Sequence, residues 1–501
     1  MMEYIFQRRG AMSEQSIALW GRFEYQVTDV DDPRHFTDTE LSATFTCGEE
    51  SRTVWGFYNG NGQFILRFMP DIPGVWHYRI SSNIPSQSPV EGTFTCVPET
   101  QLTGPVQRDG DGHFRYANGN AFYPFGTTAY VWNYQPDDIQ QQTLASLAAS
   151  PFNKIRMCVF PKHYRYNLQE PMRFPFPGTL DQGFDFTRFD TTFFAQLESQ
   201  IQKLDELNIE VDLILFHPYD RWGFSAMSQE TDRRYLRYVV ARLASFKNIW
   251  WSLANEFDLL KEKPMSFWDA AIAQIKCEDP SSHMISIHNW HNPPIHYRSN
   301  AHWYDHHNPA LTHASIQHHD MHFVPEWRQT FAKPIVIDEC CYEGNVDLGW
   351  GNITGEKMTA LFWHGVILGG YVTHGETYLN EDEIIWWSHG GTLKGASIPR
   401  IAFLRNILEE GQAKRLAPLP WGSHWDTSMG ISCEGNWGLF YFGDHCPAYK
   451  MMTMLPENTA WKVDIIDTWA MTITPVAGVI QHGDKLDLPA KPWIALRLTK
   501  L

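Results

Sequence analysis

The chain has 501 residues, of which 43% are apolar and 19% charged, and its formal net charge is −17. This length predicts two to four domains with ordinary folded cores. The negative charge argues against a nucleic-acid partner, since phosphate binding needs clustered Lys and Arg, and no apolar run is long enough to predict a membrane span.

The N-terminal segment "MMEYIFQRRGAMSEQS" lacks the long apolar stretch and the small-residue cleavage site of a secretory signal. We therefore expect a cytoplasmic protein. The eight cysteines form no Cys-x-x-Cys zinc pattern. Cys47 and Cys96 each end a "TFTC" strand, and Cys433 and Cys446 could face each other across a hairpin, but without a secretory signal we expect buried free thiols. The sequence leaves the oligomeric state open.

The first region, to about residue 100, consists of short alternating strands separated by turn residues. Examples are "LSATFTC", "RTVWGFY" and "QFILRFMP", the last preceded by the turn "NGNG". About seven short strands at this spacing predict an immunoglobulin-like β-sandwich over residues 1–100.

The middle region, residues 101–413, alternates strands with amphipathic helices. The strand candidates are residues 121–128, 152–160, 210–217, 249–255, 283–289, 313–319, 334–339 and 369–375. Eight such units favour an α/β fold of the (β/α)8 TIM-barrel type. An open doubly wound sheet is the alternative, but no glycine-rich phosphate loop follows the first strand.

The last region, residues 414–501, returns to alternating strands such as "WGLFYFG" and "WIALRLT". We expect a small C-terminal β-sandwich here. The simplest role of both flanking domains is to buttress the barrel, and sugar binding by either one is the alternative.

Two of the predicted barrel strands end in acidic residues. The apolar strand in "IWWSLANEFD" ends in Asn255 and Glu256, and "PIVIDE" ends in Asp338 and Glu339. Active sites of such barrels lie at the carboxyl ends of the strands, and glycoside hydrolysis needs two carboxyl groups facing one another. Since side chains alternate along a strand, Asp338 is the rival to Glu339 for the second position.

These motifs resemble those of a known group of enzymes. "LANE" and "PIVIDE" resemble the paired catalytic motifs of clan A retaining glycoside hydrolases, and "FNKIRM" resembles their second strand. The order sandwich, barrel, sandwich and the "YEG" after "PIVIDE" are similar to bacterial candidate glycoside hydrolases with an apiosidase-like barrel. In those relatives the strand-four acid can be Asp, whereas this chain has Glu preceded by Asn, which leaves apiose as the sugar open.

The resemblance implies a role for four residues. Glu256 would be the general acid/base and Glu339 the nucleophile. Asn255 would bind the 2-hydroxyl of the sugar, and Arg156 would hold Glu339 ionised. A Trp beneath the sugar is a further feature of the clan, and Trp386 or Trp387 of "IIWWSHGG" would supply it, although core packing is equally open to both.

Four histidines stand at predicted strand ends and are candidate substrate-binding residues: His217, His288, His318 and His374. The alternative for histidines in such positions is a structural role, in which the ring satisfies buried backbone groups. The same residues permit an alternative, a metal-dependent barrel hydrolase. Against it, the first strand has no His-x-His pair and no helix carries His-Glu-x-x-His. A second alternative is a carbohydrate-binding protein without catalysis.

From these patterns we predict a retaining glycosidase with a carbohydrate substrate and with neither a metal nor an organic cofactor. Without a secretory signal, imported short oligosaccharides or glycosides are the expected substrates. We therefore expect exo action from a pocket rather than attack within a polymer.

Overall fold

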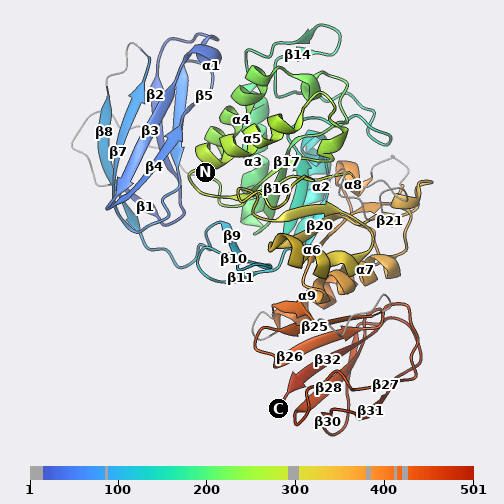
Figure 1. Cartoon of the computed structure of the whole chain (residues 1–501). Helices are drawn as coiled ribbons and strands as arrows, with labels where there is room; N and C mark the ends of the chain where they lie inside the picture. Colours follow the sequence, from blue (N-terminus) through green and yellow to red (C-terminus); the bar gives the residue numbers. More distant parts are fainter. Residues whose placement is uncertain (1–14, 85–88, 291–303, 380–384, 411–414, 420–426) are drawn as a thin grey trace.

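The computed structural model describes residues 15–84, 89–290, 304–379, 385–410, 415–419 and 427–501. Figure 1 shows three parts in chain order, an N-terminal pair of sheets, a central barrel surrounded by helices, and a C-terminal pair of sheets. Most of the N-terminal segment and the expected boundary between residues 413 and 414 lie outside the described residues. The domain bounds stay predictions.

The N-terminal part contains eight strands and a short helix. They are β1 (Ser16–Ala18), β2 (Phe23–Thr28), α1 (His35–Asp38), β3 (Leu41–Cys47), β4 (Glu50–Trp55), β5 (Phe57–Tyr58), β6 (Gln63–Phe68), β7 (Gly74–Ser82) and β8 (Val90–Val97). One sheet has the order β1-β8-β7-β3-β4 and the other β2-β6-β5. Both sheets share one core, in which Phe45 stacks on Phe68 with ring centroids 4.2 Å apart. The immunoglobulin-like assignment stays a prediction.

Eight parallel strands form the barrel. They are β12 (Gly126–Thr128), β13 (Lys154–Cys158), β16 (Glu210–Phe216), β17 (Ile249–Ala254), β18 (Met284–Ser286), β19 (Ala314–Gln317), β20 (Ile335–Glu339) and β22 (Tyr371–His374). The sheet runs β18-β17-β16-β13-β12-β22-β20-β19, and a parallel bridge between His288 and Ser315 joins its two ends. The predicted TIM barrel is confirmed, and the open doubly wound sheet is wrong.

The first predicted strand, residues 121–128, is divided in two. Its first half is β11 (Ala121–Phe122), which joins β9 (Val106–Asp109) and β10 (His113–Tyr116) in a small separate sheet. Pro124 has no N–H to continue a ladder, so the chain breaks there. The second half enters the barrel as β12. At Gly126 a Cβ would lie only 2.7 Å from Thr373 Oγ1, so the close strand contact there requires glycine.

Helices surround the barrel (Figure 1). They are α2 (Asp137–Ala148), α3 (Thr191–Glu206), α4 (Gln229–Leu243), α5 (Met265–Glu278), α6 (Val324–Phe331), α7 (Gly355–Ile367), α8 (Trp386–His389) and α9 (Ile398–Glu409). Helix α3 shows how the sequence starts one: the Asp190 carboxylate accepts from the backbone N–H groups of Thr192 and Phe193, both at 2.9 Å. No helix in the described ranges is both long and apolar enough to cross a membrane.

Four short strands lie in loops between the barrel elements. They form two pairs, β14 (Gly178–Thr179) with β15 (Gly183–Phe184), and β21 (Glu343–Gly344) with β23 (Glu376–Thr377). The second pair follows β20 and β22, so it extends the barrel beyond the carboxyl ends of two neighbouring strands.

The C-terminal part has one large and one small sheet. Its strands are β24 (Leu416–Pro418), β25 (Ser428–Ser432), β26 (Trp437–Tyr441), β27 (Tyr449–Met451), β28 (Ala460–Asp467), β29 (Thr472–Pro475), β30 (Ile480–Gln481), β31 (Lys485–Asp487) and β32 (Ile494–Lys500). The large sheet has the order β24-β25-β26-β32-β28-β29 with β30 beside β28, and β27 pairs with β31. All eight cysteines of the chain are free thiols in the structure; the expected burial holds for Cys96, Cys158 and Cys340, whereas Cys277, Cys433 and Cys446 are exposed.

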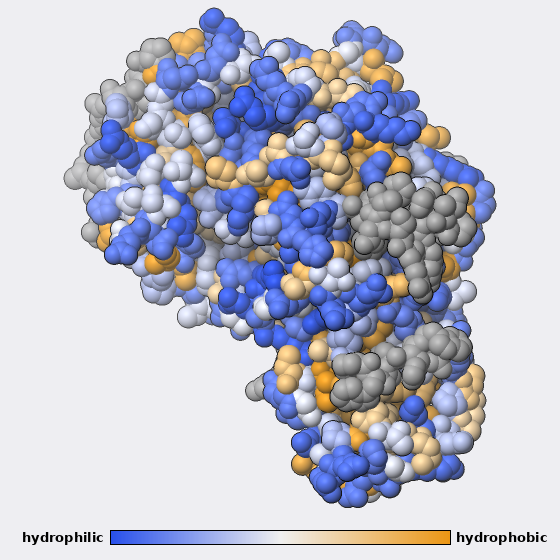
Figure 2. All heavy atoms as spheres, viewed as in Figure 1, coloured by the Kyte–Doolittle hydropathy of each residue, from blue (hydrophilic) through white to orange (hydrophobic). Residues whose placement is uncertain are grey.

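Both flanking parts contact helices on the outside of the barrel. Arg67 of β6 reaches Glu198 of α3 at 2.7 Å and the carbonyl oxygen of Arg242 in α4 at 2.9 Å. On the other side, His364 of α7 hydrogen-bonds Ser428 of β25 at 2.7 Å. Hydrophilic and hydrophobic residues are interspersed over the face in Figure 2, as on an ordinary water-exposed surface.

A cluster of charged residues fills the interior of the barrel. The Lys154 ammonium lies 2.6 Å from Asp212 and 2.8 Å from Asp338. The Arg156 Nε lies 3.6 Å and 3.9 Å from the same two carboxylates. All four side chains are buried, where charges are tolerated only when they are paired.

Candidate active site

A cavity of about 310 Å³ opens at the carboxyl ends of the barrel strands. Every residue that lines it stands at the end of a barrel strand or in the segment that follows, and two of these residues lie in a short helical turn of such a segment, Trp350 in one and Trp387 of α8 in another. The lining consists of Tyr130, Lys162, Tyr164, Tyr219, Asn255, Glu256, Trp290, Gln317, His318, His319, Glu339, Cys341, Tyr342, Trp350 and Trp387. None of these residues comes from the flanking parts, so the barrel alone forms the described wall.

Glu256 lies two residues beyond β17 in a strained backbone conformation. Its φ of 50° and ψ of 55° are in the left-handed region, which is uncommon for residues other than glycine. The Tyr219 hydroxyl donates a hydrogen bond to its Oε2, and its backbone N–H lies 3.4 Å from His288 Nδ1. Such strain persists where the surroundings fix it, and it is concentrated at functional sites.

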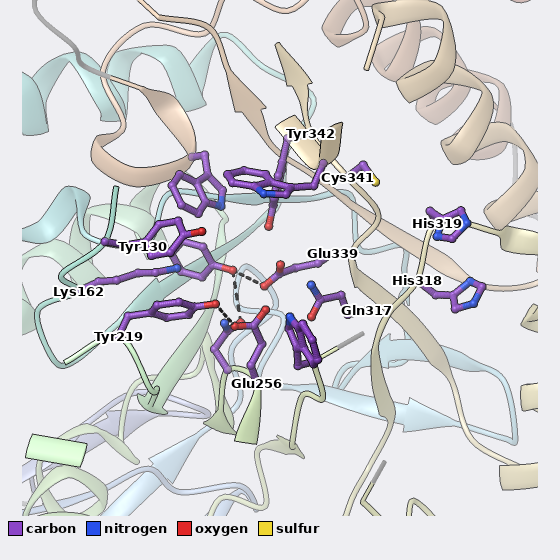
Figure 3. A pocket seen from close by; sticks show the side chains of 15 residues that line it. Tyr130, Lys162, Tyr219, Glu256, Gln317, His318, His319, Glu339, Cys341 and Tyr342 are labelled. Atoms are coloured by element: carbon purple, nitrogen blue, oxygen red, sulfur yellow. Dashed lines mark hydrogen bonds between the residues drawn. The ribbon is translucent and has the colours of Figure 1, made fainter. Parts of the chain in front are cut away.

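Glu339 is the last residue of β20 and faces Glu256 across the cavity (Figure 3). The Tyr130 hydroxyl donates to its Oε1, and the Arg156 guanidinium lies 3.5 Å from the same oxygen. Each of the two glutamates therefore receives one tyrosine hydroxyl, and among the described residues only Glu339 of the two also has a Lys or Arg nitrogen within 4.0 Å.

The pKa values of the two carboxyl groups are shifted in opposite directions. Burial, reinforced by the charge of Glu339, raises the pKa of Glu256 to about 8. Burial alone would also raise the pKa of Glu339. His288, Arg156 and Lys162 outweigh that effect and hold this pKa below its ordinary value. Near neutral pH the site thus holds one protonated and one ionised carboxyl group.

Asn255 is fixed by a hydrogen bond to its side-chain oxygen. Arg156 Nη2 donates to Asn255 Oδ1 at 3.1 Å, and the Tyr130 hydroxyl oxygen, whose hydrogen is given to Glu339, lies 3.3 Å from the same atom. With its oxygen turned toward Arg156, the amide group presents N–H donors to the cavity that it lines. Arg156 itself lies beneath the cavity, linking Asn255 to Glu339.

Asp338, the sequence rival of Glu339, faces the barrel interior. Its carboxylate accepts hydrogen bonds from Lys154 at 2.8 Å, Ser315 at 2.5 Å and Thr373 at 3.0 Å. It is fully buried and does not line the cavity. The carboxylate at the cavity is therefore that of Glu339.

Comparison with protein families gives the class of this barrel. A family model described as "Apiosidase-like, catalytic domain" matches residues 108–436, more than half of the chain. The chain belongs to the apiosidase-like family. Models of two domains of unknown function match the flanking parts, DUF5060 at residues 16–83 and DUF5605 at residues 425–499. No curated protein matches the chain.

Solved structures are consistent with this membership. A candidate glycoside hydrolase from Bacteroides vulgatus ATCC 8482 is 38% identical with a TM-score of 0.90, covering 97% of this chain and 100% of that one. A family 5 glycoside hydrolase from the same source is 12% identical with a TM-score of 0.61, covering 79% and 94%. At that identity the second match shows the fold alone. The family match and the first structure identify this apiosidase-like chain as a glycoside hydrolase.

The predicted histidines do not gather in this apiosidase-like site. His217 contacts the Phe160 carbonyl oxygen at 3.2 Å, and His374 contacts Thr127 at 3.1 Å, both away from the cavity lining. His288 lies behind Glu256, and His318 lines the cavity. Among the described residues no group of three or more His, Cys, Asp or Glu side chains is arranged to hold a metal ion. The metal-dependent alternative therefore gains no support from these four residues.

The two tryptophans of "IIWWSHGG" have different surroundings. Trp387 lines the cavity, and its ring is 5.6 Å from that of Tyr130. Trp386 is buried in the barrel core and donates its indole N–H to Thr127 at 2.9 Å. Of the two candidates for the floor beneath a sugar, only Trp387 is at the cavity.

Sequence reasoning missed most of the aromatic wall of the site. Tyr130, Tyr219 and Lys162 were not singled out, and Tyr342 entered only as part of the "YEG" motif, without a place at the site, although all four line the cavity. Each follows a predicted strand within a few residues, so position after a strand end was the available signal. That signal did not separate them from the many other tyrosines and lysines in loops.

Proposed function

We propose that this apiosidase-like enzyme is a retaining glycosidase in which Glu339 is the nucleophile and Glu256 the general acid/base. The observation that carries the proposal is the pair of buried glutamates in one cavity with pKa values shifted apart. Glycoside hydrolysis with retention needs this division, a protonated carboxyl group beside an ionised one.

In the first step Glu339 attacks the anomeric carbon while Glu256 gives its proton to the departing glycosidic oxygen. The carbon–oxygen bond to the leaving group breaks, and a covalent bond between the sugar and Glu339 forms. The positive charge of Arg156 at 3.5 Å favours the ionised Glu339 that this attack requires. The leaving group departs as a neutral alcohol.

In the second step Glu256, now ionised, takes a proton from water, and the resulting hydroxide attacks the same carbon. The bond to Glu339 breaks and its carboxylate is restored, so the configuration is inverted twice and retained overall. Asn255 would donate its amide N–H to the 2-hydroxyl, a contact that strengthens as positive charge develops on the sugar ring.

Cavity size supports action at the end of a chain. A volume of about 310 Å³ is at the small end for ligand pockets and favours one terminal sugar over a segment of polymer. Trp387 offers a flat apolar face on which a sugar ring packs. We therefore propose exo action on oligosaccharides or glycosides.

The test is a panel of aryl glycosides given to the wild type and to Glu339→Ala, with and without azide. We expect the wild type to hydrolyse at least one of them. Glu339→Ala should lose about 10⁴-fold or more of this activity and recover part of it with azide, giving a glycosyl azide of inverted configuration. Activity that survives Glu339→Ala without azide contradicts the proposal. Circular dichroism of the variant shows whether its fold is intact.

A further inference from the structure

Four lysine side chains are buried in the described part of the chain, and one of them differs from the rest. The four are Lys154, Lys162, Lys263 and Lys333. Lys154 and Lys263 donate to carboxylates, and Lys333 to backbone carbonyls, at 2.5–2.8 Å. For Lys162, no carboxylate oxygen of the described residues lies within 4.0 Å of its ammonium nitrogen.

Aromatic rings surround the Lys162 ammonium instead. Its nitrogen lies 3.6 Å from the centroid of the Tyr130 ring, 4.2 Å from Tyr219, 4.7 Å from Trp387 and 5.7 Å from Tyr164. Ring faces attract a cation but do not replace oxygen acceptors for its three N–H groups. The cage therefore holds the charge in position and leaves hydrogen-bonding capacity on a side chain that lines the cavity.

The cage places this ammonium beside both proposed catalytic groups. Its two closest rings are those of Tyr130, which donates to Glu339, and Tyr219, which donates to Glu256. Figure 3 shows the Lys162 side chain between these two tyrosines, on the side of the cavity that faces both glutamates. A sugar held between the glutamates would thus be adjacent to Lys162.

The balance of charge indicates which sugars fit. In the barrel interior, the cations Lys154 and Arg156 are matched by two aspartates. At the cavity, Lys162 is the one Lys or Arg among the described lining residues, and together with Arg156 it favours the ionised Glu339. An acidic sugar would bring a second negative charge beside Glu339 with no further lysine or arginine in the described lining to match it, whereas a neutral sugar adds no charge.

We propose that Lys162 is a specificity-determining residue whose ammonium donates a hydrogen bond to a hydroxyl oxygen of a neutral sugar in the cavity. This inference rests on the proposed glycosidase function and names the class of its substrate, a neutral hydroxylated sugar rather than a uronic acid. Removal of either partner leaves the other buried without its hydrogen bond.

The test combines Lys162→Met with monodeoxy versions of the aryl glycoside that the wild type hydrolyses. With the parent glycoside, kcat/KM should fall about 10- to 100-fold, as expected for a hydrogen bond to a charged group. With the one deoxy glycoside that lacks the bound hydroxyl, the wild type and Lys162→Met should differ by less than about threefold. The other deoxy glycosides should show the full loss. The matching uronide should be a poorer wild-type substrate than the neutral glycoside.

Lys263→Met is the matched control. Lys263 is also buried and lies 4.5 Å from the Phe267 ring, but it pairs with Asp232 at 2.5 Å and does not line the cavity. This variant should lower the melting temperature, because it leaves Asp232 unpaired, without changing the ranking of the deoxy glycosides. A loss of stability alone therefore does not mimic the expected pattern.

Two results would overturn the inference while leaving the glycosidase function intact. One is an equal loss in Lys162→Met for the parent and for every deoxy glycoside. The other is a wild type that prefers the uronide. By contrast, wild-type hydrolysis that is undiminished in Glu339→Ala would overturn the proposed function itself.

Discussion

The barrel interior and the cavity above it both contain buried charges, but they satisfy them differently. In the interior, Lys154 is bound by two carboxylates at 2.6 Å and 2.8 Å, and Asp338 accepts three hydrogen bonds. At the cavity, Glu256 and Glu339 each receive a tyrosine hydroxyl, and Lys162 is held by rings. Charges with several close partners, such as Lys154 and Asp338, stabilise one structure, whereas the charged groups at the cavity have fewer close partners and retain the capacity to bind and react.

Asp338 and Glu339 are adjacent in sequence, but Asp338 belongs to the barrel interior and Glu339 lines the cavity. Both lie near Arg156, whose guanidinium is 3.9 Å from Asp338 and 3.5 Å from Glu339. Arg156 therefore contacts both the interior cluster and the active site. Substitutions in the interior cluster should mainly change stability, and substitutions at the cavity should mainly change activity.

The largest effect on activity outside the nucleophile is expected for Glu256→Gln. Loss of the proton donor should lower kcat/KM about 10²- to 10⁴-fold for glycosides with poor leaving groups. A dinitrophenyl glycoside needs no proton on its leaving oxygen. With this substrate, the rate at which the covalent intermediate forms should be nearly the same in Glu256→Gln as in the wild type. Stopped-flow kinetics with both substrates measures this difference. An equal loss with both would contradict the role of Glu256 as acid.

A stability comparison of Asp338→Asn with Glu339→Gln separates the two regions next. Asp338→Asn leaves Lys154 and Arg156 undercompensated and should lower the free energy of unfolding by about 3–5 kcal/mol. Glu339→Gln removes a carboxylate whose pKa the folded site lowers, so it should also cost stability, but less than Asp338→Asn because Arg156 keeps its two aspartates, while activity is abolished. Denaturant unfolding and kcat at a temperature where both variants are folded test the pair. The reverse ranking would assign the reactive carboxylate to Asp338.

The smallest expected effect is the pH dependence of kcat/KM in the wild type, which tests the protonation state of each glutamate. Glu256 must carry its proton, and its pKa is raised to about 8, so kcat/KM should fall as the pH rises through about 8. Glu339 must be ionised, and its pKa is lowered, so activity should persist to a pH below the ordinary range of a glutamate. With the dinitrophenyl glycoside in Glu256→Gln, the alkaline fall should disappear. A retained fall there would assign it to another group.

The sequence predicted the barrel because its strands are apolar runs that end abruptly in polar residues. Glu256 and Glu339 stand out for the same reason, and both lie at the cavity. The break at Pro124 was missed because residues 121–128 contain apolar side chains on both sides of the proline.

The surroundings of the glutamates were not accessible from the pattern. Tyr130, Tyr219 and Lys162 meet only because loops after three different strands converge, and no periodicity encodes that convergence. The strand-end histidines were overvalued for a related reason. Position at a strand end does not say which way a ring turns, and His217 and His374 turn away from the cavity to bind oxygen atoms elsewhere.

The most direct test of the central claim is to trap the covalent intermediate on the protein. A 2-deoxy-2-fluoro glycoside of the hydrolysed sugar with a dinitrophenyl leaving group slows both steps, because fluorine disfavours the oxocarbenium-like transition state. The good leaving group lets the intermediate accumulate. Mass spectrometry should show one fluoroglycosyl group added to the peptide that contains Glu339. A label on a different residue, or turnover to a product of inverted configuration without any label, would contradict the two-glutamate retaining mechanism.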